Sequence, residues 1–316
     1  MTGVQTCALP ILFSGGRKLK FSKPATTFDQ QIDQLIERGM LIPDRDYARH
    51  YLTHLNYYRL GAYWLPFEAD HATHTFSPDT HFDEVVSLYV FDRELRLLVM
   101  DAVERLEVSI RTQWAYNLAH AYGPHAHLNA DIFKNNNVHQ RCLRKLNEEL
   151  GRSKEVFVSH YQKHYNDPEL PPVWAVVEVM SLGQLSQWVS GLSRGQDRQA
   201  ISKNYGIDEV ILTSFLHHLT IVRNICAHHG RLWNRRFGFK AKMPKRPEPL
   251  QESLNPDQPR YIYNTLVMLE YFMNIISPDH HWKARLIALF EKHPVASFSA
   301  MGFPDDWQTR PIWQKK

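Results

Sequence analysis

The chain has 316 residues, of which 43% are hydrophobic and 12% aromatic, enough to bury the core of one large domain or two small ones. Its formal net charge of +4 is small, so any argument for a nucleic-acid partner depends on where the charges lie. The three cysteines are too far apart for a disulfide framework or a zinc site, and no apolar run approaches a membrane span, so we expect a cytoplasmic protein without a membrane partner.

The beginning of the chain differs in character from the rest. Its apolar segment, which ends at Ile11, is too short and too uncharged at its front for a signal peptide. The segment resembles a translated sequencing adapter at the start of a metagenomic gene model. We therefore expect a non-native, disordered leader that is not part of the fold.

Two short helices and an aromatic segment are predicted next. Thr27 and Gln30 have the spacing of a capping box, and Asp44 can cap a second helix. Residues 56–67 are dense in aromatic side chains, which indicates core packing or, as the alternative, a surface that stacks single-stranded bases. Residues 68–82 are predicted to form a polar loop or small hairpin, because their three histidines lack the spacing of a metal site.

A single long helix is predicted from Asp83 to about Ala121. Apolar residues recur there with a period near 3.6, and neither Gly nor Pro interrupts them. The other sides carry many charges, a pattern typical of a solvated face.

Further helices are predicted along the middle of the chain. One covers residues 138–150, and another begins after Pro172 and continues to Trp188. Glu178 is the only acid among the apolar positions of the second helix. It either pairs with Arg223 inside a bundle or lies on a solvated face.

The most informative stretch is a helix that ends near Gly230, a residue type that favours a helix C-terminus. Its apolar positions have helical spacing, namely Leu212, Phe215, Leu216, Leu219, Val222 and Cys226. Asn224 and His228 are four residues apart and lie on one face. Arg223 is about 140° round the axis from His228, a separation that a long guanidinium arm can span.

A basic segment comes directly after this helix. It contains seven Lys or Arg and no acid, namely Arg231, Arg235, Arg236, Lys240, Lys242, Lys245 and Arg246. Three aromatic residues, Trp233, Phe237 and Phe239, are interleaved with them. The segment is either a solvated loop or a surface that contacts the phosphate backbone of RNA. A Pro-rich, extended linker to Pro259 and two closing helices, at 261–276 and 281–292, complete the chain.

The string from Arg223 to Arg235, Arg-Asn-Ile-Cys-Ala-His-His-Gly-Arg-Leu-Trp-Asn-Arg, closely resembles the Abi-like (AbiD/AbiF type) abortive-infection proteins of the HEPN ribonuclease superfamily. Residues 56–67, 91–96 and 104–107 carry the same resemblance. It implies an RNA-cutting toxin that halts a phage-infected cell. It also implies that the long helix belongs to the core bundle and presents Arg105 or Arg111 to the site.

The chemistry of these residue types suits RNA cleavage without a metal. RNA carries its own nucleophile, the 2′-hydroxyl beside each phosphodiester. Histidine can move a proton near neutral pH, and arginine can meet the charge on the phosphorane, so we predict Arg223, Asn224 and His228 as the catalytic residues. The predicted products carry a 2′,3′-cyclic phosphate and a 5′-hydroxyl. We expect no cofactor and no metal, because His217 and His228 are three helical turns apart, about 16 Å, and cannot converge on one ion.

Arg231, Arg235, Arg236, Lys240 and Lys242 are the predicted RNA-binding residues. The alternative function is a non-catalytic RNA-binding or regulatory HEPN module, in which this basic segment acts and His228 only caps a helix. Cleavage also needs an acid for the leaving oxygen, so we expect a homodimer whose two Arg223–His228 pairs share one cleft. A restraining partner, an antitoxin protein or a regulatory RNA, is implied by the resemblance.

No alternation long enough to build a sheet is present, so the predicted class is all-α, a helical bundle with an N-terminal helical extension and a small hairpin. The expected organisation has four parts: a leader (1–20), an N-terminal helical segment (21–82), a HEPN-like core (83–300) and a tail (301–316).

Overall fold

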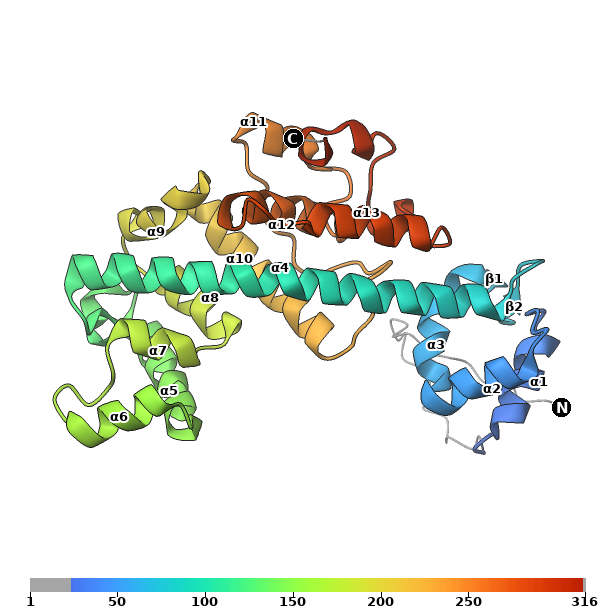
Figure 1. Cartoon of the computed structure of the whole chain (residues 1–316), viewed down its shortest axis with the longest axis horizontal. Helices are drawn as coiled ribbons and strands as arrows, with labels where there is room; N and C mark the ends of the chain where they lie inside the picture. The colour runs from blue at the N-terminus through green and yellow to red at the C-terminus, as the bar shows by residue number, and fades with distance from the viewer. Residues whose placement is uncertain (1–23, 315–316) are drawn as a thin grey trace, which may run out of the picture. The chain divides into compact units, whose positions relative to one another are not determined.

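The computed structural model describes residues 24–314, so the predicted leader lies outside the described residues. The all-α prediction is confirmed: this part of the chain contains thirteen α-helices and one two-stranded hairpin (Figure 1). It divides into two compact units. Unit 1 comprises the chain up to Glu94 together with residues 289–296, and unit 2 comprises residues 95–288 and the chain from residue 297 onward.

Unit 1 contains the N-terminal helices and the hairpin, α1 (Phe28–Glu37), α2 (Arg45–His54), α3 (Tyr57–Trp64), β1 (Glu68–Asp70) and β2 (Thr75–Phe76). The predicted capping box is confirmed, since Thr27 and Gln30 bond reciprocally at the start of α1. Asp44 caps α2 as predicted.

The aromatic segment of α3 contributes to the core of unit 1. Leu60, Tyr63 and Trp64 are buried, and the Tyr63 hydroxyl donates to the buried Asp92 carboxylate at 2.6 Å. Core packing therefore explains most of this cluster, although Tyr58 remains 53% exposed. The core prediction is confirmed for these buried positions.

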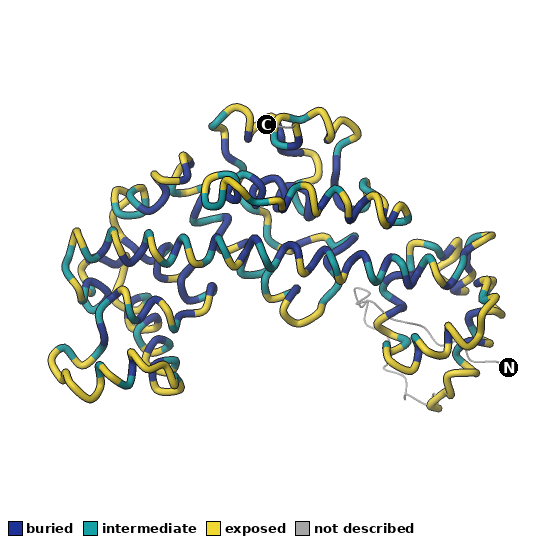
Figure 2. Tube along the Cα trace, viewed as in Figure 1, coloured by how far each residue is buried: buried dark blue, intermediate teal, exposed yellow. Residues whose placement is uncertain are grey.

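The long helix α4 (Phe82–Tyr122) matches the predicted helix closely and passes from unit 1 into unit 2. Figure 2 shows buried positions recurring along its length. Regular apolar spacing without a helix breaker is sufficient to specify such an element.

Unit 2 holds the remaining helices, α5 (Asn136–Arg152), α6 (Val156–His164), α7 (Val173–Val179), α8 (Leu182–Gly191), α9 (Gly195–Ser202), α10 (Glu209–Ala227), α11 (Glu248–Ser253), α12 (Tyr263–Ile276) and most of α13 (Trp282–Lys292). The predicted extended linker before Pro259 is wrong in part, because α11 forms within it. A proline at the N-terminus of a helix has no amide hydrogen to leave unpaired, so the Pro-rich composition did not prevent this turn.

The single helix predicted from Pro172 to Trp188 is wrong, because the chain breaks between α7 and α8. Met180 has extended backbone, and Ser181 starts α8 with a capping box to Gln184. Arg111 of α4 donates to the carbonyl oxygens of Glu178 and Met180 at 3.3 and 2.6 Å, and so satisfies the end of α7. The Glu178 carboxylate lies 3.6 Å from this same arginine and its side chain is 54% exposed, so of the two alternatives the solvated face is confirmed and the pair with Arg223 is wrong.

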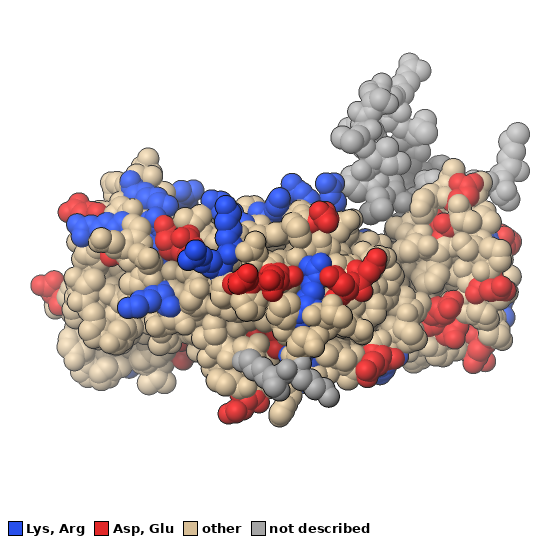
Figure 3. Space-filling view, turned by 90° about the horizontal axis from the view of Figure 1, so that it is seen from above, with Lys and Arg blue, Asp and Glu red and all other residues tan. Residues whose placement is uncertain are grey.

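Charged side chains are unevenly spread over the surface. On the face drawn in Figure 3, several Lys and Arg side chains gather in clusters, and groups of Asp and Glu lie both beside these clusters and apart from them. A small net charge therefore does not describe the local surface, and each candidate site has to be judged from its own residues.

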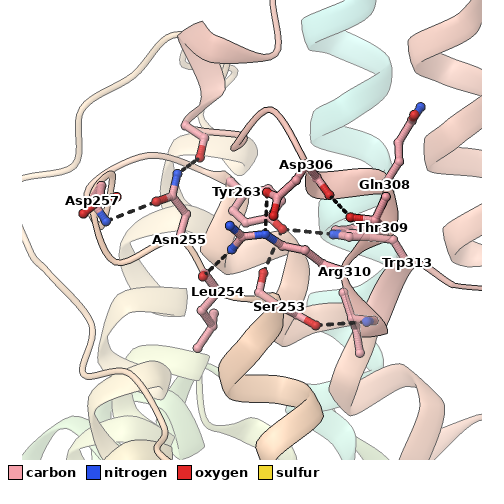
Figure 4. Close-up of polar contacts among 12 residues, drawn as sticks. Ser253, Leu254, Asn255, Asp257, Tyr263, Asp306, Gln308, Thr309, Arg310 and Trp313 are labelled. Carbon is pink, nitrogen blue, oxygen red and sulfur yellow. Dashed lines mark hydrogen bonds and ion pairs between the residues drawn. The ribbon is translucent and has the colours of Figure 1, made fainter.

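The segment predicted as a tail contributes packed turns to unit 2. Figure 4 shows how these turns join the end of α11: Arg310 donates to the Leu254 carbonyl at 2.6 Å, and Asn255 donates to the Gly302 carbonyl at 2.9 Å. Trp313 is 5% exposed, and its ring nitrogen donates to the Tyr263 hydroxyl. Buried aromatic surface and paired polar groups thus hold residues up to 314 against α11 and α12.

Candidate active site at the end of helix α10

Helix α10 carries the predicted catalytic residues, and its apolar stripe is confirmed. Asp208 caps its first turn by accepting from the Val210 amide. The six predicted apolar positions are all buried, namely Leu212, Phe215, Leu216, Leu219, Val222 and Cys226. The helix packs against α8 and α9. This packing fixes which face of α10 remains open to solvent.

The end of α10 is a Schellman motif. The Gly230 amide donates to the Ile225 carbonyl, and the His229 amide donates to the Cys226 carbonyl. His229 takes the left-handed conformation, with φ of 56°. The sequence pointed to Gly230 as the capping residue, but the position that needs positive φ is one residue earlier and is occupied by histidine. His229 thus has a backbone role in ending the helix.

The catalytic candidates lie on the last turn before this cap. Arg223 is half-buried, and its Nη1 donates to the Asn224 side-chain oxygen at 3.2 Å. Asn224 and His228 are both exposed, and the His228 amide still bonds the Asn224 carbonyl, so the two side chains remain one turn apart on one face. The contact with Asn224 draws the guanidinium toward that face.

A buried arginine from α4, which the sequence reasoning missed, contacts the motif. Arg96 is 5% exposed, and its Nη1 lies 3.4 Å from the Gly230 carbonyl oxygen, directly after the Schellman turn. The expectation that Arg105 or Arg111 reaches the site is wrong. Arg105 pairs with Asp101 on its own helix, and Arg111 donates to the Met180 carbonyl at the break between α7 and α8. One feature of the sequence does indicate Arg96: although it is charged, it lies close to the helical spacing of the buried apolar residues of α4.

The basic segment after α10 runs back along the helix. The Lys242 amide donates to the Ser214 hydroxyl at 2.9 Å, and the Phe239 ring lies 4.5 Å from the His217 ring. Of the five predicted RNA-binding residues, Arg236, Lys240 and Lys242 are exposed. The other two are half-buried, and Arg235 donates to the Arg231 carbonyl at 3.3 Å. The segment therefore places cations beside the helix that carries the catalytic candidates.

The two histidines in the middle of α10 have different environments. His218 is buried, and its Nε2 lies 2.8 Å from the Thr265 hydroxyl. Burial lowers the pKa of His218 to about 4, so this ring is neutral near pH 7. His217 is exposed to solvent, about 100° round the helix axis from His218. His218 is therefore part of the core, and His217 is a surface residue.

Two further properties of the described residues concern metal ions and membranes. Among residues 24–314, no group of three or more His, Cys, Asp or Glu side chains is arranged to hold a metal ion. Within the same residues, α10 alone is long and apolar enough to cross a membrane by length and composition, which corrects the expectation that no segment approaches a span. The core helix of a soluble protein has the same length and composition, and the packing of α10 against α8 and α9 is that of a core helix.

A comparison with known protein families identifies the family of this chain. A family model described as Abi-like protein matches residues 50–234, more than half of the chain, and the match includes α4, α10 and the whole Arg223–His228 motif. Comparisons with curated proteins and with solved structures found no match. The family description suggests a role in abortive infection. The chain belongs to the Abi-like protein family.

Proposed function

We propose that this protein is a metal-independent endoribonuclease of the HEPN type that acts in the cytoplasm as an abortive-infection effector. The observation that carries the proposal is the contact of Arg223 with Asn224, one helical turn before the exposed His228, inside the segment matched by the Abi-like family. A permanent cation beside a group that transfers protons is what cleavage by the RNA's own 2′-hydroxyl requires.

The proposed reaction assigns one role to each side chain. His228 removes the proton from the 2′-hydroxyl, and the 2′-oxygen attacks the neighbouring phosphorus. Arg223 meets the charge that develops on the non-bridging oxygens. Asn224 orients the guanidinium through its side-chain oxygen. The bond from phosphorus to the 5′-oxygen breaks, and the products are a 2′,3′-cyclic phosphate and a 5′-hydroxyl.

The leaving 5′-oxygen needs a proton, and a second copy of the chain is the proposed source. A two-fold homodimer that brings two motifs together would supply a second His228 as the acid. Helix α4 offers apolar surface in unit 2, where Leu97 and Val108 are 62% and 52% exposed. These residues are eleven positions apart and about 20° round the axis, so they lie on one face, on which Asp101 and the exposed Glu104 stand between them. Two exposed apolar side chains separated by acids are the contact that we propose for an identical copy.

Abortive infection also requires that the nuclease be held inactive in healthy cells. We propose a restraining partner, an antitoxin protein or a regulatory RNA, because an unrestrained ribonuclease would arrest its own host. This part of the proposal rests on the family role alone.

The basic segment favours a second candidate function. Its exposed cations, Arg236, Lys240 and Lys242, would bind an RNA backbone whether or not cleavage occurs. In this alternative the protein is an RNA-binding or regulatory module, and His228 serves only the end of the helix.

Incubation of purified protein with RNA in EDTA separates the two functions. The wild type should cleave, and His228→Ala should be slower by about 10²-fold or more, the usual loss when a general base is removed. Arg223→Ala should behave in the same way, because the developing phosphorane charge loses its cation. His164→Ala is the matched control, since His164 is also an exposed helical histidine of unit 2. RNA binding without cleavage by the wild type would support the binding module and refute the nuclease.

A further inference from the structure

Four aromatic rings form a ladder between α10 and the basic segment. Phe237 and His218 are buried, with ring centroids 5.0 Å apart. His218 and Phe239 come next at 6.5 Å, and Phe239 and His217 at 4.5 Å in an edge-to-face arrangement. Exposure rises along the ladder, because Phe239 is half-buried and His217 is exposed. The ladder thus begins in the core and ends on a solvent-facing ring whose orientation is set by Phe239.

His217 shares a face of α10 with the catalytic candidates. It precedes Asn224 by seven residues and His228 by eleven, so the three positions fall within about 40° round the helix axis. The rise from His217 to His228 is about 16 Å. One open face therefore carries the proposed cleavage site at its C-terminal end and an exposed aromatic ring three turns earlier.

The surroundings of this face are positively charged. The chain from Val210 to Pro247 contains no Asp or Glu. Lys240 is exposed directly after Phe239, and Lys242 is exposed where its amide is anchored to Ser214. The nearest acid before this stretch, Glu209, is paired with Arg198 at 2.7 Å. A polyanion that runs along α10 would therefore meet lysine and arginine side chains from residues 210–247 and no acidic side chain from them.

We propose that the His217–Phe239 pair is a stacking subsite that holds one unpaired nucleobase of the substrate RNA, a few nucleotides from the phosphodiester at His228. The proposal rests on the proposed ribonuclease function and extends it by naming the substrate class, single-stranded RNA. Aromatic side chains bind bases through their faces, which are hidden in a duplex and free in a single strand. Lys240 and Lys242 would hold the backbone on either side of the stacked base. The subsite would set both a minimum substrate length and the register of the cut.

An abasic scan tests this subsite. The substrate is a DNA oligonucleotide with one ribonucleotide, which allows a single cut, and one base is deleted at successive positions on both sides. For the wild type, kcat/KM should fall at one position by about 5- to 150-fold, the range expected for loss of one base–aromatic stack. His217→Ala should cut the complete substrate more slowly by a similar factor. Its kcat/KM should not depend on where the base is missing. His217→Tyr keeps a ring and should restore the dependence, and the control His164→Ala should retain the wild-type profile.

The outcomes separate this inference from the proposed function. A wild-type rate that is independent of the abasic position would overturn the stacking subsite and leave the nuclease intact. If the wild type does not cut at all, the nuclease proposal fails, and fluorescence anisotropy with the same labelled oligonucleotides decides the subsite. Position-dependent binding that is lost in His217→Ala would support it, and uniform binding would overturn it.

Discussion

His127 makes the stability of unit 2 sensitive to acid. Its side chain is 0% exposed, and neither ring nitrogen has a hydrogen-bond partner among the described residues. Burial, and to a smaller extent the neighbouring His125 and His139, together lower the pKa of His127 to about 3 from its ordinary value of 6.5. The charged ring is therefore excluded from the folded protein at every pH above about 3.

The sign and size of the effect come from proton linkage. Between pH 6.5 and about 3 the unfolded chain protonates His127 and the folded chain does not, so the free energy of unfolding falls as the pH falls. At pH 5, one and a half units below the pKa of His127 in the unfolded chain, the free energy of unfolding is lowered by about 2 kcal/mol. At pH 7.5 this loss is close to zero. His218, with a pKa lowered to about 4, adds a similar loss at pH 5.

Urea unfolding of wild type and His127→Leu at pH 7.5 and pH 5.0 measures this contribution. The Trp188 ring lies 6.5 Å from His127, so tryptophan fluorescence reports on the region. The variant should lose about 2 kcal/mol less than the wild type between the two pH values, because the contributions of His218 and other groups cancel in the comparison. The exposed His164→Leu is the control and should behave like the wild type. Equal losses in wild type and His127→Leu would refute the reasoning.

Three further predictions concern the proposed site. His229→Ala should impair cleavage less than His228→Ala, because His229 has a backbone role in the Schellman turn; a more severe defect in His229→Ala would show that the catalytic histidine is misassigned. Neutralising four cations of the basic segment should lower the slope of log affinity against log salt by about 0.7 for each lost phosphate contact, and an unchanged slope would mean that the segment is only solvated. The four are Arg235, Arg236, Lys240 and Lys242. Mixing His228→Ala with Arg223→Ala subunits should restore part of the cleavage if the two copies share one cleft, whereas a monomer by sedimentation that cuts at full rate would exclude the dimer.

Local sequence patterns were sufficient for most helices. The capping box at Thr27, the Asp44 cap and the uninterrupted period of α4 each describe interactions within a few residues, and each is present in the structure. The same is true of the apolar stripe of α10 and of the exposed face that carries Asn224 and His228. Such features depend on the period of the helix and on short-range hydrogen bonds, which the order of residues specifies directly.

Contacts between distant segments were decided only by tertiary structure. Arg111 reaches the carbonyl groups of the α7–α8 break, Arg96 reaches Gly230, and Phe239 packs against His217. Nothing in the spacing of α4 distinguishes an arginine that meets the motif from one that meets another helix, because that choice depends on how helices cross and not on their own period. The order of residues along α10 specifies which of them share its open face, whereas the path of the basic segment back along that face determines which rings and cations lie beside it.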